Sequence, residues 1–200
     1  MIRRELDAAL DVSLIGLDAA GLGPATARDA IRAAAAAGCT WCLVDLRLPH
    51  AHLIEALDGG GLDVIAIASA GCVLPPRSLA GIAWAGTRGT APAGTRHGAC
   101  DPAGPATADF ILAARPEAGL PDGDAPILLR LRPHADPRLQ AIADEAECPL
   151  AALSLSPWLC CDGVRAIAVP ADDATGAAEL AGLVHIPRQA ELDAIAAATT

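Results

Sequence analysis

Three side chains that could act together in acyl-transfer chemistry stand at the ends of two apolar runs. Asp45 lies in the run at 39–46, His50 follows it, and Ser69 follows the run at 64–68. The carboxyl ends of neighbouring parallel strands meet at one edge of a sheet, where α/β proteins place their sites. A serine, a histidine and an aspartate so placed match the groups of a hydrolase triad. Because Ser69 stands in ASAG and not in a G-x-S-x-G turn, a polar rim around a pocket is the simpler interpretation.

The pair Cys39-x-x-Cys42 has a spacing that metal and redox sites use. On a strand, however, side chains three positions apart point to opposite faces and cannot share one ion. We therefore interpret both thiols as small apolar side chains of a packed strand, and we expect no metal. The seven cysteines are irregularly spaced and MIRRELDAAL is not a signal peptide, which favours reduced thiols and a cytoplasmic location.

Apolar runs alternate with helical runs along the chain. Strands are predicted at residues 12–17, 39–46, 64–68, 106–113, 127–131 and 164–169. Helices are predicted at residues 25–37, 50–57, 137–147, 149–161, 175–184 and 189–198, with Pro157 interrupting the fourth. This alternation predicts right-handed βαβ units around a parallel sheet that is covered on both faces. Residues 72–105 are rich in Gly, Pro and Thr and predict a long, poorly ordered loop within a single domain.

The composition of the chain argues against several classes of function. The net charge is −10, and all 14 basic residues are arginines, so the chain is unsuited to nucleic acid or to anionic membranes. No apolar run approaches the roughly 18 residues of a membrane span. The apolar fraction of 53% comes largely from alanine, with 2% aromatic residues, which predicts a core of small side chains and a marginally stable monomer.

The order of several motifs resembles the aldo-keto reductase family. VSLIGLDAAGLG, AGCTWCLVDLR, LIEAL and DVIAIASAG follow the family's VSxxGLGTxGLG, AGITLFDTAxxYG, sExxLGeAL and vxIATKxG. DFILAARPEAGLP matches its fourth strand, and residues from about 137 onward match its last helices and cofactor loop. The resemblance implies an α/β fold of the (β/α)8 type with outer helices. Because only six strands are predicted in 200 residues, we expect a partial or shortened barrel. Residues 1–10 are then either a short helix or the hairpin that closes the bottom of the family's barrel.

The family's catalytic residues are not retained at the matching positions. Its Asp, Tyr, Lys and His positions fall on Leu43, Leu48, Ser69 and Ala114, and the chain contains no Tyr and no Lys. Carbonyl reduction of the family's type needs a positioned proton donor, and none of these four side chains supplies one. We therefore expect a catalytically degenerate reductase. Asp45, His50, Ser69 and Arg115 would form the rim of its pocket.

The cofactor implied by the resemblance is NADP, held by the loop after the last strand. Here Pro170 and Ala171 are followed by two aspartates, and Asp18 replaces a glycine of the family's first motif, close to Gly16. Negative charge at these places opposes a phosphate dianion, so we expect weak dinucleotide binding or none. The same carboxylates also suit the start of a helix.

Three hypotheses remain open. In the first, the chain is an inactive reductase kept as a binding subunit, a homo-oligomer or the partner of a complete reductase. In the second, it is an active NAD(P)-dependent oxidoreductase whose acid is a replacement such as His50. In the third, it is a hydrolase that uses Ser69.

Overall fold

Seven parallel strands form one curved sheet in the computed structural model, which describes residues 2–7, 10–58, 60–68, 81–84, 111–113 and 126–199. They are β3 (Ile15–Asp18), β4 (Trp41–Asp45), β5 (Asp63–Ala68), β6 (Gly81–Trp84), β7 (Ile111–Ala113), β8 (Ile127–Arg130) and β9 (Val164–Pro170). The order β6-β5-β4-β3-β9-β8-β7 places each strand beside its sequence neighbour and β9 beside β3. Cα atoms of β6 and β7, the two end strands, come within 8 Å of each other. The sheet therefore curves into a shortened barrel, as the sequence predicted.

The predicted strands correspond closely to the observed ones. The runs at 39–46 and 127–131 contain β4 and β8, and those at 64–68 and 164–169 contain all but one residue of β5 and of β9. β7 lies within the run at 106–113. β6 lies within the segment 72–105, for which no strand was predicted. The rest of that segment lies outside the described residues.

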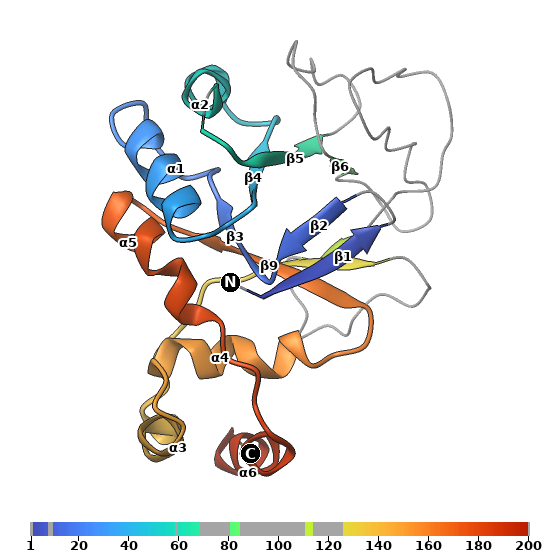
Figure 1. Cartoon of the computed structure of the whole chain (residues 1–200), viewed down its shortest axis with the longest axis vertical. Helices are drawn as coiled ribbons and strands as arrows, with labels where there is room; N and C mark the ends of the chain where they lie inside the picture. Colours follow the sequence, from blue (N-terminus) through green and yellow to red (C-terminus); the bar gives the residue numbers. More distant parts are fainter. Residues whose placement is uncertain are drawn as a thin grey trace.

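The run at 12–17 is not one strand, and that prediction was wrong. Its first residues belong to β2 (Leu10–Ser13), which pairs antiparallel with β1 (Arg3–Asp7), and β3 begins only at Ile15. The Ser13 hydroxyl donates to the Ile15 carbonyl at 2.6 Å, and such a local bond turns the backbone out of a strand. The described residues of this segment, 2–7 and 10, therefore contribute to a hairpin, one of the two alternatives that the sequence left open. The hairpin crosses the barrel in Figure 1.

Helices cover part of the outer surface of the barrel (Figure 1). They are α1 (Ala27–Ala36), α2 (Ala51–Leu57), α3 (Gln140–Glu145), α4 (Leu150–Leu159), α5 (Ala174–Glu179) and α6 (Gln189–Thr199), with 3-10 turns η2 (Pro137–Leu139) and η3 (Leu180–Leu183). α1 ends where Gly38 adopts a φ of 92°, a conformation that favours glycine. α4 continues through Pro157, contrary to the predicted interruption, although the proline has no N–H for the usual bond to the preceding turn.

The apolar core has an inner and an outer part. The inner cluster fills the barrel with Val12, Trp41, Leu43, Ile65, Ile67, Leu128, Ala166 and Ala168. The outer cluster lies between the sheet and helices including α1, α2, α4 and α5. A smaller cluster joins η2, α3, α4 and α6 at the lower end of Figure 1. Within the described part of the chain, no helix is long and apolar enough to cross a membrane.

The amino-terminal end of the barrel interior, which we call the floor, is made of Ser13, Gly16, Thr40 and Trp41. The Trp41 indole donates to the Ser13 carbonyl at 2.9 Å. The Ser13 amide donates to the Thr40 hydroxyl at 2.9 Å, and the Thr40 amide donates to the Ser13 hydroxyl at 3.1 Å. The indole ring lies so close to Gly16 that a Cβ there would be 2.2 Å from it. Arg4 of the hairpin adds bonds to the Leu159 and Val164 carbonyls.

Candidate functional site

The opposite end of the barrel gathers charged side chains. Side chains alternate along each strand, so the residues that continue the inward-facing columns can be named from the inner cluster. Asp45 follows Trp41 and Leu43 on β4, Arg130 follows Leu128 on β8, and Asp18 follows Gly16 on β3. All three are the last residues of their strands, at the end of the barrel where enzymes of this architecture place their sites. We call Asp18, Asp45, Arg47 and Arg130 the mouth.

Asp18 and Arg130 form an ion pair across the mouth. Arg130 Nε donates to Asp18 Oδ2 at 2.5 Å, and Arg130 Nη2 donates to Asp18 Oδ1 at 3.2 Å. The Asp18 side chain is only 3% exposed and that of Arg130 is 30% exposed. β9 lies between the two strands, and its residue Ala168 pairs with Arg130 in register. A small residue there leaves room for the long arginine side chain to reach β3.

Asp45 is bound by Arg47, two residues further along the chain. Its Oδ1 accepts from the Arg47 amide at 3.1 Å and from Arg47 Nε at 2.8 Å, and its Oδ2 accepts from Arg47 Nη2 at 2.6 Å. The hydrogen bonds from Arg47, with a smaller contribution from the charge of Arg130, hold the pKa of Asp45 below its usual value. Asp45 is therefore an ionised acceptor at neutral pH and has no proton to donate.

Of the two members of the predicted pocket rim that the structure describes, one lies in the mouth. Asp45 is there, whereas His50 stands immediately before α2, with Nδ1 at 2.8 Å from the Leu48 carbonyl. The hydrogen bonds of Asp45 go to Arg47 and that of His50 goes to Leu48, so the Asp–His link of a triad is not made. Ser69, Ala114 and Arg115 lie outside the described residues.

The structure describes two of the four positions that match the family's catalytic residues. Both carry apolar side chains, in different surroundings. Leu43 is fully buried in the inner cluster of the barrel, one inward layer below Asp45. Leu48 is 46% exposed in the loop between β4 and α2. Neither side chain can hold or donate a proton.

The residues considered for NADP do not fit its phosphate. Gly16 lies under the Trp41 ring in the floor, and Pro170 closes β9 beside Asp18. Ala171 is buried. The side chain of Asp173 accepts from the Gly176 amide at 2.9 Å and so caps α5. Asp172 and Asp173 place two carboxylates at this helix end, where a phosphate dianion would be repelled.

Sequence reasoning missed the two arginines of the mouth. Arg130 and Arg47 each carry a charge at the end of an apolar run, in ILLR and in CLVDLR. A charged residue at the end of an apolar run was the available signal, and of the charged residues in the mouth it was used only for Asp45. The distance of 112 positions between Arg130 and Asp18 hid their pairing.

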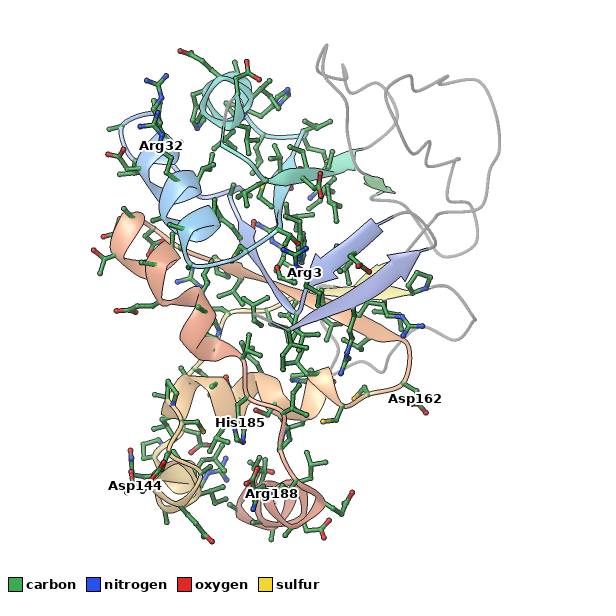
Figure 2. All side chains as sticks on the ribbon, viewed as in Figure 1. Arg3, Arg32, Asp144, Asp162, His185 and Arg188 are labelled. Carbon is green, nitrogen blue, oxygen red and sulfur yellow. The ribbon has the colours of Figure 1, made fainter. Side chains whose placement is uncertain are left out.

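Other polar clusters lie away from the mouth. His185 and Arg188 flank the start of α6 at the lower end of Figure 2, where the Glu191 carboxylate accepts from the His185 ring and from the Arg188 amide, both at 3.0 Å. Cys39 and Cys42 are buried in the outer cluster, and burial raises the pKa of the Cys39 thiol to about 11. Across the described ranges, no group of three or more potential ligands could hold a metal ion.

The fold, and not the sequence as a whole, is similar to that of known proteins. The sequence matches no protein-family model and no curated protein. Two solved structures are similar in fold. An aldo-keto reductase from a Medee basin deep-sea metagenome library aligns with a TM-score of 0.59 and 8% identity, over 98% of this chain and 94% of that one. An aldo-keto reductase from Bacillus halodurans, in its apo form, aligns with a TM-score of 0.54 and 13% identity, over 99% and 96%.

These likenesses identify the class of fold. The chain is a shortened barrel of the aldo-keto reductase type, as the order of its motifs indicated. At such low identities the likeness describes the fold, and the chemistry has to be argued from the chain's own side chains.

Proposed function

We propose that this chain is a reductase-type barrel that no longer reduces carbonyl groups and instead binds a ligand at its mouth. The observation that carries the proposal is the state of the two mouth carboxylates. Each is almost fully buried, and each is bound by an arginine through two or more hydrogen bonds. Carboxylates held in this way accept hydrogen bonds from their arginines, whereas carbonyl reduction needs a proton donor beside the forming alkoxide.

Two further features support the proposal. The described family positions, Leu43 and Leu48, are apolar. The start of α5 carries Asp172 and Asp173 where the cofactor phosphate would lie, and the Gly176 amide is already bonded. The proposal includes a binding role beside another protein, either a second copy or a complete reductase.

An assay of NADPH oxidation with a panel of aldehydes and ketones tests the loss of catalysis. We expect the rate to stay at the no-enzyme baseline, because general acid catalysis alone is worth about 10²–10⁴-fold. A titration with NADPH and with NADH should give no saturable binding. An aldo-keto reductase with a complete catalytic set serves as the positive control in both experiments. Turnover above baseline with any substrate would refute the proposal.

The competing oxidoreductase hypothesis depends on His50. Its Nδ1 is bonded to the Leu48 carbonyl, which leaves Nε2 as the nitrogen that could exchange a proton with a substrate. If turnover is found, the His50→Ala variant should abolish it. His52→Ala is the matched control on the adjoining helix, with Nε2 2.8 Å from the Leu22 carbonyl, and it should leave the turnover unchanged. Equal activity in the two variants would reject His50 as the acid.

A further inference from the structure

The Arg130 guanidinium has two edges that each present a pair of parallel N–H groups. One of these edges is bonded to Asp18. Nε and Nη2 donate to the two oxygens of Asp18, which is a side-on pairing. A guanidinium has five N–H donors in a fixed plane, so the outer edge, made of Nη1 and the second hydrogen of Nη2, points away from Asp18. Among the described residues that outer edge has no hydrogen-bond acceptor.

The obvious internal acceptor, Asp45, is already occupied. Both of its oxygens accept from Arg47, through three bonds of 2.6 to 3.1 Å. The charge of Arg130 nevertheless acts on Asp45 and lowers its pKa. Arg130 is therefore hydrogen-bonded to one aspartate of the mouth and acts on the other through its charge.

The exposed fractions of the side chains show which charged groups of the mouth lie deepest. The two carboxylate side chains are each 3% exposed, whereas those of Arg130 and Arg47 are 30% and 42% exposed. A ligand that enters the mouth therefore meets guanidinium groups first, with the carboxylates behind them. The arrangement offers hydrogen-bond donors and positive charge to the ligand, and its rigidity is set by the buried Asp18.

We propose that the mouth binds a small planar carboxylate, held by the outer edge of the Arg130 guanidinium. A planar carboxylate matches the two parallel N–H groups of such an edge, and this charge-assisted pairing is stronger than a neutral one. The inference rests on the proposed function, since it names the ligand class of the same mouth. A phosphate group shares the charge but not the planar shape.

The test uses the full chain labelled with ¹⁵N at arginine and titrated with acetate, while the Arg Nε–H resonances are observed. We expect a saturable shift of the Arg130 resonance with acetate. Acetamide has the same shape without the charge, and it should bind at least tenfold more weakly. Inorganic phosphate is charged but tetrahedral, so it should also bind more weakly than acetate. An unshifted Arg130 resonance, or equal affinity for acetate and acetamide, would overturn the proposal.

Matched variants give a second measurement, made by calorimetric titration with acetate. Arg130→Lys keeps the charge and loses the paired edge, so its affinity for acetate should fall about tenfold. Arg138→Gln is the control, because Arg138 forms a similar pair with Asp136 on the exposed turn before α3, away from the mouth. The Arg138→Gln variant should bind acetate as tightly as the unaltered chain. A loss of equal size in both variants would contradict the proposal, as would unchanged affinity in Arg130→Lys.

Two outcomes separate this inference from the proposed function. If acetate does not bind and NADPH turnover stays at baseline, the ligand class is wrong and the loss of catalysis stands. If acetate binds as expected and turnover is nevertheless found, the ligand class stands and the proposed function is wrong.

Discussion

The floor and the mouth of the barrel are built from different kinds of polar contact. In the floor, Ser13, Thr40 and Trp41 join through neutral hydrogen bonds among hydroxyl, indole and backbone groups. In the mouth, two buried aspartates are joined to two partly exposed arginines. Neutral bonds satisfy buried groups at little cost, whereas buried charges carry a large desolvation penalty. A protein that needs only stability can use the first kind at both ends. The proposed binding role would use these charges.

We expect the floor to resist added volume more strongly than the loop that follows β3 at the opposite end of the barrel. Gly16→Ala should destabilise the fold by about 3 kcal/mol, because the new Cβ would overlap the Trp41 ring. The ring cannot simply move away, since its Nε1 is bonded to the Ser13 carbonyl. Urea unfolding followed by circular dichroism measures the change. The control is Gly21→Ala, where a Cβ meets nothing within 4 Å; a loss there as large as at Gly16 would contradict the packing argument.

At the mouth, removal of a single charge should lower the stability less than Gly16→Ala does. Arg130→Met should cost about 2 kcal/mol in the free energy of unfolding, because it leaves the buried Asp18 carboxylate without its partner. The double variant Asp18→Asn, Arg130→Met should recover most of that loss, since it removes both charges. If the double variant is no more stable than Arg130→Met, the ion pair is not what links the two residues.

A third change tests whether neutral bonds hold the floor together. Ser13→Ala should destabilise the protein by about 1 kcal/mol, because the Thr40 amide loses its acceptor in a buried place. Thr26→Ala is the matched control, since the Thr26 hydroxyl makes an exposed bond of 3.3 Å to the Gly23 carbonyl. Chemical denaturation of the two variants side by side gives the difference. Similar midpoints would mean that the floor network adds little.

The smallest expected effect is the pH dependence that Asp45 gives to stability. Its folded-state pKa lies below the ordinary value of 3.8, chiefly through the Arg47 hydrogen bond. The contribution is therefore present above about pH 4 and is lost as the pH falls through the folded-state pKa. Urea midpoints measured at neutral pH and at about pH 3 should differ less for Asp45→Asn than for the unaltered chain. Identical pH dependence in the two proteins would show that Asp45 is not stabilised by its partner.

Sequence reasoning recovered the strands with continuous apolar runs and failed where one run crossed a turn. β4, β5, β8 and β9 were predicted because buried parallel strands are apolar throughout. The run at 12–17 was predicted as one strand, because nothing in its hydrophobicity marks the turn between Ser13 and Ile15. β6, in a stretch rich in Gly and Pro, was missed because its flanks resemble a loop. Motif order predicted the fold class correctly despite identities of 8% and 13% to the similar structures.

What the sequence determined by itself is local. The alternation of apolar and helical runs specifies parallel strands, Gly38 ends a helix, and leucine stands at positions 43 and 48, which match the family's Asp and Tyr positions. The pairing of charges was decided only by the tertiary structure. Arg130 and Asp18 are 112 residues apart and meet because β8, β9 and β3 are neighbours in the sheet, with small Ala168 between them. Which charges neutralise each other depends on distance and burial, and a linear pattern of residue types contains neither.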